Sequence, residues 1–160
     1  FLSVRDDWVN RPANGPQTYD ELVRPLDLAI LEAASAGTFN MLHACGRPQN
    51  FAALASYPVH AINWADRAAG PSITYACERV KAAPAALSNR RAAAAIAAGV
   101  DNLKTLPYGT PDDCAREVRD ALPQAKQRPI IVAAGCTYDP AIVPEQNLLA
   151  VVKAAREAKG

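Results

Sequence analysis

The chain has 160 residues, half of them hydrophobic and 21% charged, which suits one globular domain with a sizeable core rather than a disordered chain. Its formal net charge is +1, from 17 basic and 16 acidic residues, so the charge balance does not indicate binding to nucleic acid or to an anionic membrane surface. No apolar run approaches the roughly 18 residues of a membrane span, no signal peptide is recognisable, and four cysteines do not resemble a disulfide framework, so we expect a cytoplasmic protein.

The first predicted element is a strand over residues 1–5, and a loop rich in Asn, Pro and Gly follows it over residues 6–17. The chain does not begin with Met, and the strand reads as though it were entered midway. We therefore expect the sequence to be a piece of a longer protein.

A helix is predicted to begin at Thr18, because Glu21 follows it at the spacing of a capping box, and to end at Gly37. Pro25 lies inside this segment and should kink it, since proline has no N–H to donate within a helix. The apolar positions at helical spacing predict the side that faces the core: Leu22, Leu26, Ala29, Ile30 and Ala33.

The segment after this helix carries two side chains suited to metal binding. Residues 38–42 predict a short buried strand, which Gly46 and the following Arg-Pro end. His43 and Cys45 stand at its carboxyl end, two positions apart, and the period of a strand places both on one face. An imidazole nitrogen and a thiolate are zinc ligands. The alternative, which this stretch alone favours, is a hydrogen-bonded core histidine beside a small buried cysteine.

The rest of the chain alternates between helices and strands. Helices are predicted over residues 48–56, 72–81, 110–126 and from 144 to the chain end, and strands over 58–64 and 128–134. Ser72 and Thr110 are the expected caps of two of these helices. Residues 92–100 suit either a helix, by their alanine content, or a buried strand, which we favour. The continuous apolar run 130–134 indicates a strand buried on both faces.

About five alternations of strand and helix predict an α/β fold with a largely parallel sheet covered by crossover helices. The chain is too short for a complete (β/α)8 barrel, which needs about 200 residues or more, so we expect a single domain over residues 1–160 that forms a late portion of such a barrel. Chemistry in these folds lies at the carboxyl ends of strands, and several polar residues are predicted there: Ser3, His43, Cys45, Asn63, Asp66, Asp101 and Cys136. The other two cysteines, Cys77 and Cys114, fall within predicted helices and are interpreted as buried hydrophobes.

Six short motifs follow one another along the chain: Phe1-Leu2-Ser3, Leu42-His43-Ala44-Cys45-Gly46, Gly99-Val100-Asp101, Tyr108-Gly109-Thr110-Pro111-Asp112-Asp113, Gly135-Cys136 and Pro144-Glu145-Gln146-Asn147. In this order and placement they resemble the carboxyl-terminal half of the uroporphyrinogen decarboxylase (URO-D) superfamily, whose members are TIM barrels. That superfamily also contains zinc-dependent methyltransferases that act with methylcobamide corrinoid proteins. The resemblance covers nearly the whole chain.

The methyltransferases of that family hold zinc through a His-x-Cys and a later Gly-Cys, so the resemblance implies His43, Cys45 and Cys136 as zinc ligands. It further implies that the intact protein transfers a methyl group from a methylcorrinoid, carried by a corrinoid protein, to a small thiol. The expected catalytic residues are then Ser3 and Asp101. The expected substrate contacts are Asn63, Asp66 and Tyr138.

The alternative is a uroporphyrinogen decarboxylase of porphyrin biosynthesis, which acts on a tetrapyrrole and needs no metal. Ser3 resembles a substrate-contacting serine of those enzymes, and Asp101 or Tyr138 would supply the protons. Cys136, however, stands where the decarboxylases carry a histidine. A third possibility is a folded half without activity of its own. The open strand edges of such a half would lead to association as a homodimer.

Overall fold

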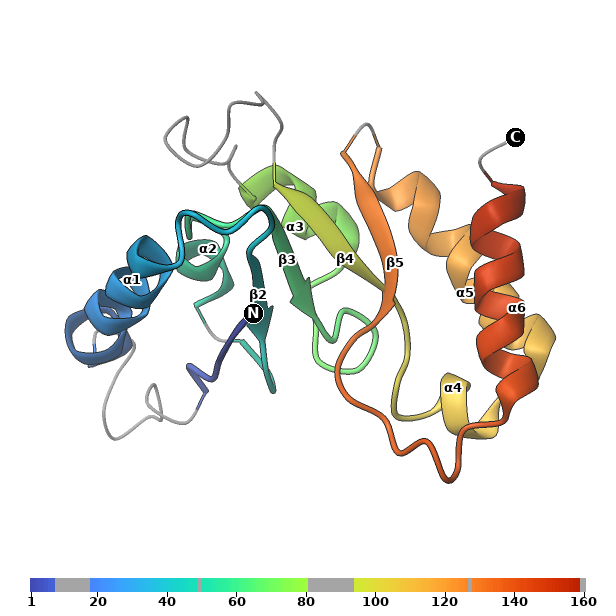
Figure 1. Ribbon diagram of the computed structural model, residues 1–160. Helices are drawn as coiled ribbons and strands as arrows, with labels where there is room; N and C mark the ends of the chain where they lie inside the picture. The colour runs from blue at the N-terminus through green and yellow to red at the C-terminus, as the bar shows by residue number, and fades with distance from the viewer. Residues whose placement is uncertain (8–17, 49, 81–93, 127, 159–160) are drawn as a thin grey trace.

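The computed structural model describes residues 1–7, 18–48, 50–80, 94–126 and 128–158. Its centre is one sheet of five parallel strands, which lie in the order in which the chain visits them (Figure 1). The strands are β1 (Leu2–Val4), β2 (Met41–Ala44), β3 (Ala61–Trp64), β4 (Ala95–Val100) and β5 (Ile130–Ala134). Parallel neighbours need a crossover between them, so the predicted α/β fold is confirmed. The strand favoured for the ambiguous segment 92–100 is confirmed as β4.

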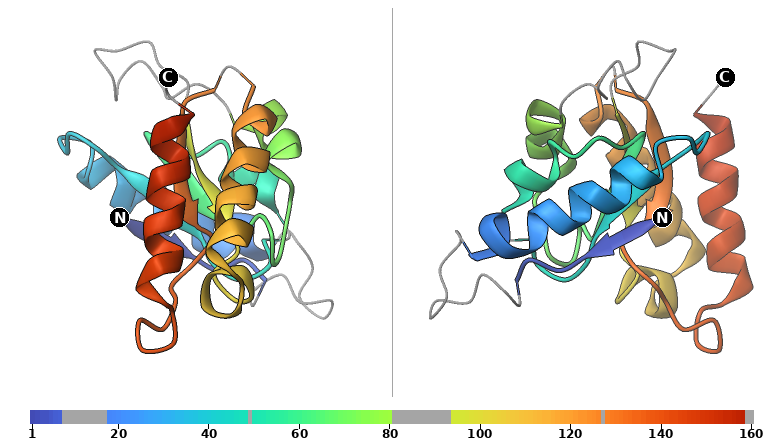
Figure 2. Two further views of the ribbon diagram at one scale, coloured as in Figure 1. Left: turned by 90° about the vertical axis from the view of Figure 1, so that its right-hand side faces the viewer. Right: turned by 60° about the vertical axis from the view of Figure 1, so that its left-hand side comes forward.

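Helices connect and cover these strands. They are the π-helical turn η1 (Tyr19–Val23), α1 (Arg24–Ala33), α2 (Phe51–Leu54), α3 (Ile73–Arg79), α4 (Thr105–Tyr108), α5 (Pro111–Gln124) and α6 (Glu145–Glu157). Figures 1 and 2 show them spread in an arc around the sheet, from α1 on one side to α6 on the other. Ser72 caps α3 and Thr110 caps α5, as predicted, and Thr110 does so in a capping box with Asp113.

Side chains alternate between the two faces of the sheet. One set, which includes Leu42, Ile62 and Ile96, is fully buried with residues of α1, α2, α3 and α5 in the main core. Val100 and Val132, on the same face, pack with α5 and α6. Helices on one face, together with a strand order that follows the chain, are the arrangement of part of a barrel. A doubly wound sheet would instead have helices on both faces and a reversal in strand order.

The segment predicted as one kinked helix from Thr18 divides at Arg24, where the π-helical turn ends and α1 begins with Pro25 in its first turn. The capping box predicted with Glu21 is wrong, because Thr18 makes no side-chain cap hydrogen bond. The predicted core-facing stripe is wrong as well. All five of its residues are exposed: Leu22, Leu26, Ala29, Ile30 and Ala33.

The face of this segment that is buried instead carries Tyr19, Asp27 and Leu31. The hydroxyls of Tyr19 and Tyr57 both donate to the Asp27 carboxylate, so the carboxylate is satisfied inside the protein. A pattern of apolar residues does not predict this arrangement, because it assigns an aspartate without a visible partner to the solvent-exposed side. The helix is therefore rotated relative to the predicted one.

The prediction that β5 is buried on both faces is wrong. Ile131 is 41% exposed, and among the described strands β5 pairs with β4 alone, so it lies at an edge of the sheet. Val132 and Ala134 pack towards the helices, whereas Ile131 lies on the opposite face in register with Ala97. An apolar run in the sequence therefore does not distinguish an edge strand from a central strand.

The two cysteines outside the motifs are in the predicted helices: Cys114 is buried in α5, and Cys77 is half-buried in α3. The loop predicted over residues 6–17 lies largely outside the described residues. Of the helices that the structure describes, none combines the length and the apolar character that crossing a membrane requires.

Candidate metal centre

Three side chains from the ends of two strands meet on the face of the sheet opposite the helices. His43 belongs to β2, Cys45 follows the last residue of β2, and Cys136 lies just beyond β5. One ligand atom from each residue, an imidazole nitrogen or a sulfur, lies within 4.8 Å of the other two. Nε2 of His43 is 3.3 Å from the Cys136 sulfur, although 93 positions separate these residues in the chain. The strand ends thus converge as expected for part of a barrel.

Two glycines allow the chain to turn where the ligands stand. Gly46, directly after Cys45, has a φ of 76°, and a side chain there would come within 2.7 Å of a neighbouring carboxylate. Gly135, directly before Cys136, packs so closely on Ala65 that an added Cβ would lie 2.5 Å from the Ala65 Cα. A left-handed turn at Gly46 and the close packing of Gly135 on Ala65 therefore place the two cysteines, and neither leaves room for a larger residue.

A cavity of about 350 Å³ opens beside these side chains. It is lined by Phe1, Ser3, His43, Cys45, Asn63, Ala134, Cys136 and Thr137. The Phe1 ring stacks on the His43 imidazole, with 6.1 Å between the ring centroids. Phe1 and Thr137 are lining residues that the sequence interpretation misses. Phe1 could have been found, because it stands two positions before Ser3 and a strand places both on one face.

Burial shapes the protonation of the ligands. It lowers the pKa of His43, which keeps the imidazole neutral near pH 7 and one ring nitrogen free to bind a metal. Burial raises the pKa of Cys45, and Cys136 raises it further because two neighbouring thiolates repel each other. The Arg5 guanidinium acts on the Cys45 pKa in the opposite direction. A divalent cation between the sulfurs would displace their protons and remove the repulsion.

The donor set fits zinc. Zinc prefers thiolate sulfur and imidazole nitrogen in a tetrahedron, and bonds of about 2.3 Å place the ligand atoms roughly 3.7 Å apart. Nε2 of His43 and the Cys136 sulfur are 3.3 Å apart, and no pair of the three ligand atoms is more than 4.8 Å apart. Three protein ligands leave a fourth position for water or substrate, as in catalytic rather than structural zinc sites. The described part of the chain holds no second group of three such side chains at this spacing.

Two of the other predicted site residues lie at the cavity. Ser3 lines it from β1, in register with His43 on β2. Asn63 lines it from β3, and its Oδ1 is 2.6 Å from Nδ1 of His43. Tyr138, predicted as a substrate contact, is 39% exposed and is not among the residues that line the cavity.

The two predicted aspartates hold strand-end loops and do not line the cavity. The side chain of Asp66 is 5% exposed and accepts a hydrogen bond from the Gly99 N–H at 3.0 Å, and the burial of the carboxyl raises its pKa. The Asp101 carboxylate accepts the N–H groups of Leu103 at 2.8 Å and Lys104 at 3.1 Å. Both side chains thus use their oxygens to shape the loops that follow β3 and β4.

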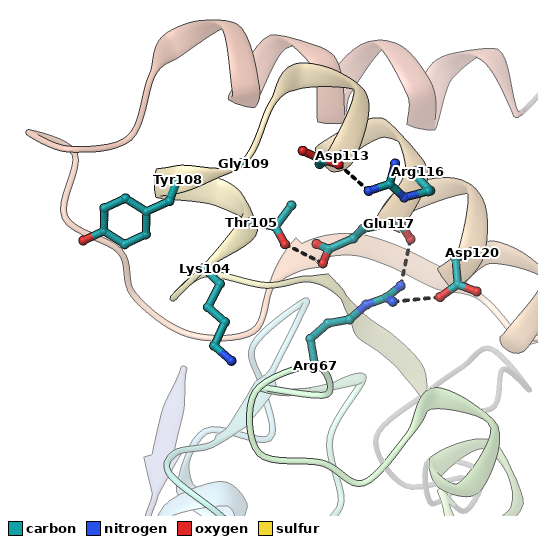
Figure 3. Close-up of a pocket in the computed structure, with 9 residues that line it drawn as sticks. All are labelled: Arg67, Lys104, Thr105, Tyr108, Gly109, Asp113, Arg116, Glu117 and Asp120. Carbon is teal, nitrogen blue, oxygen red and sulfur yellow. Dashed lines mark hydrogen bonds and ion pairs between the residues drawn. The ribbon is translucent and has the colours of Figure 1, made fainter.

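A larger depression of about 550 Å³ lies beside α5, and none of His43, Cys45 and Cys136 lines it (Figure 3). Arg67 reaches across it, donating to the Glu117 carbonyl at 2.9 Å and pairing with Asp120 at 2.7 Å. Arg116 pairs with Asp113 on the same helix. These charges are paired within the protein. The contacts of Arg67 hold the loop between β3 and α3 against α5.

No family model matches this sequence, and no curated protein matches it. Among solved structures, a methyltransferase from Methanosarcina mazei is similar, with a TM-score of 0.71 and 19% sequence identity. The similarity covers 99% of this chain and 42% of that protein, so this chain spans less than half of its length. At this identity the likeness shows the fold, and it agrees with a partial barrel.

Proposed function

We propose that this chain forms part of a zinc-dependent methyltransferase that moves a methyl group from a methylcorrinoid to a small thiol. The observation that carries the proposal is the convergence of His43, Cys45 and Cys136 within 4.8 Å at the carboxyl ends of parallel strands. The likeness in fold to a methyltransferase supports it.

In this proposal, His43, Cys45 and Cys136 hold the ion. A zinc ion bound there would lower the pKa of a substrate thiol at its free position, so that the thiolate exists near neutral pH. Phe1 and Ser3 line the cavity and would bind and orient the acceptor thiol. Asp66 and Asp101 would act indirectly, through the loops that they hold.

The acceptor thiolate would attack the methyl carbon carried by the cobalt of a corrinoid. A sulfur–carbon bond forms, the cobalt–carbon bond breaks with its electron pair left on cobalt, and the thiol proton is released to solvent. A cavity of about 350 Å³ is at the lower end of the range for ligand sites and suits a small thiol. The much larger corrinoid would be presented by a separate protein.

Metal content tests the basis of the proposal. Protein purified without a polyhistidine tag should bind about one zinc ion per chain, and Cys45→Ser and Cys136→Ser should each lose it. Cys77→Ser is the matched control, because Cys77 is also half-buried but lies in α3, and this variant should keep its zinc. Equal zinc in all four proteins, or none in the wild type, would contradict the proposal.

The thiol acceptor is tested with cobalt(II) in place of zinc, since sulfur ligands give cobalt(II) a characteristic absorption. 2-Mercaptoethanol should change the spectrum of the cobalt-loaded protein, and ethanol at the same concentration should not. Demethylation of methylcobalamin by 2-mercaptoethanol, faster with the zinc-loaded protein than with Cys136→Ser, would support transfer itself. A spectrum that does not respond to the thiol would contradict the proposed acceptor.

A further inference from the structure

Asn63 lies between the two strands whose ends bring together the candidate ligands His43, Cys45 and Cys136. It belongs to β3, in register with His43 on β2 and with Ala97 on β4. Its side chain lines the cavity, yet the residue is only 8% exposed. A polar side chain at this depth satisfies its hydrogen-bonding atoms within the protein. The partners of its amide group therefore determine what it can do.

Both amide hydrogens of Asn63 are used on backbone carbonyls. Nδ2 donates to the Ala97 carbonyl on β4 at 2.7 Å and to the Ala134 carbonyl on β5 at 3.1 Å. A carbonyl oxygen can only accept, so the NH2 group and not the amide oxygen must face these two partners. The orientation of the amide is thereby fixed, and its Oδ1 faces Nδ1 of His43 at 2.6 Å.

This orientation determines which nitrogen of His43 carries the proton. The amide oxygen of Asn63 can only accept, so Nδ1 of His43 must donate and must hold a hydrogen. In the neutral ring the lone pair is then on Nε2, which is 3.3 Å from the Cys136 sulfur. The nitrogen that faces the other two ligands is therefore the one that can bind a metal.

We propose that Asn63 is a positioning residue that fixes the tautomer and orientation of His43 and ties together the strand ends that carry the ligands. Ala134, which accepts one of its hydrogen bonds, stands two residues before Cys136, so one side chain connects the ligands of β2 and β5. This role differs from the substrate contact expected from the sequence, because both amide hydrogens are already used inside the protein.

The second histidine of the chain provides an internal comparison. Nδ1 of His60 accepts a hydrogen bond from the backbone N–H of Asn40 at 2.8 Å. That nitrogen is therefore unprotonated in the neutral ring, and the proton is on Nε2. The two histidines have opposite tautomers, and only that of His43 depends on Asn63.

Nitrogen-15 NMR of the metal-free protein at alkaline pH tests this assignment. The variant His60→Gln identifies which signals belong to which ring. The expected result is a proton on Nδ1 of His43 and on Nε2 of His60. A His43 ring protonated on Nε2 would overturn the proposal, whether or not any variant of Asn63 folds.

The variant Asn63→Leu keeps the size of the side chain and removes all three hydrogen bonds. The His43 proton should then shift towards Nε2, while an unchanged His60 tautomer reports an intact fold. Zinc affinity should fall by about 10–100-fold, and this measurement alone rests on the proposed function. A protein that binds no zinc would defeat the proposed function and leave the tautomer result standing. An unchanged His43 tautomer in Asn63→Leu would overturn the positioning role.

Discussion

The two faces of the sheet are built from alternate residues of the same strands, yet they differ in character. On the helix side, Leu42, Ile62 and Ile96 are fully buried in an apolar core. On the other side, one row in register across the five strands reads Ser3, His43, Asn63, Ala97 and Ile131. The first face holds the fold together, and the second gathers the side chains that can bind and react.

Polar groups occur on both sides, and they are satisfied in different ways. In the helix layer, Tyr19 and Tyr57 donate to the Asp27 carboxylate, and their hydroxyls lie 3.1 Å apart. That cluster contains its own donors and its own acceptor. On the other face, one imidazole nitrogen and two sulfurs converge, and two thiolates there would repel each other. A cation between these three atoms would accept a lone pair from each, so the second cluster is a candidate metal site.

The largest predicted effect is a difference between the two faces in how much a truncated side chain lowers the free energy of unfolding. Ile96→Ala removes volume from the fully buried core and should lower the free energy of unfolding by about 2–5 kcal/mol. Ile131→Ala, on the partly exposed opposite face, should lower it by less than about 1 kcal/mol. Urea unfolding followed by circular dichroism measures both. Losses of equal size would contradict the assignment of the faces.

The fold could be predicted because its signals are local. Hydrophobic runs, helix caps such as Thr110, and the alternation of strands with helices are all readable within short windows. The edge position of β5 could not be predicted, because the residues around Ile131 do not indicate which strands lie beside this one. The rotation of α1 was also hidden, since the buried position of Asp27 depends on Tyr57, 30 positions away.

The residues of the candidate site also differ in whether a local pattern predicts them. His43 and Cys45 are two positions apart, so strand geometry alone predicts their common face. Cys136 is 93 positions from His43. The local pattern predicts its place at a strand end, but only the resemblance to a family joins it to His43 and Cys45 as a ligand. Asp101 is predicted at the site from its place at a strand tip. In the structure its carboxylate accepts N–H groups of its own loop, a local bond that aspartate readily makes, and it is not among the residues that line the cavity.

Zinc should add stability through the second face. If only the folded chain binds it, zinc at 100 times its dissociation constant should raise the free energy of unfolding by about 2.7 kcal/mol. Cys136→Ser should abolish this gain. Ile131→Ala, on the same face but outside the cavity lining, should keep it. Thermal unfolding with and without zinc measures the gain, and an equal gain in Cys136→Ser would exclude the proposed ligand set.

A smaller effect is expected from the self-satisfied cluster on the helix side. Tyr57→Phe removes a hydroxyl that donates to Asp27 at 3.0 Å, while Tyr19 continues to donate to the same carboxylate. The free energy of unfolding should fall by about 1 kcal/mol, the typical net contribution of one hydrogen bond. Zinc content should not change. Loss of zinc from this variant would mean that the helix-side core and the candidate metal site are coupled.

The smallest effect should come from Asp113, which lies in the first turn of α5 and belongs to neither face. Its carboxylate accepts hydrogen bonds from the Thr110 hydroxyl at 2.7 Å and the Thr110 N–H at 2.9 Å, and it pairs with Arg116. These contacts, the hydroxyl bond first, lower the pKa of Asp113 from its ordinary 3.8 to about 2.

Because the folded chain has the lower pKa, the ionised carboxylate stabilises the fold above about pH 4, and this stabilisation is lost as the pH falls towards 2. Asp113→Asn should therefore melt slightly below the wild type at pH 7, and the difference should shrink on acidification. Melting curves of both proteins between pH 7 and pH 3 measure this, with zinc content at pH 7 as the control. A difference that grows towards pH 3 would show that the charge of Asp113 does not stabilise the start of α5, and a change in zinc content would show that this helix end reaches the metal centre.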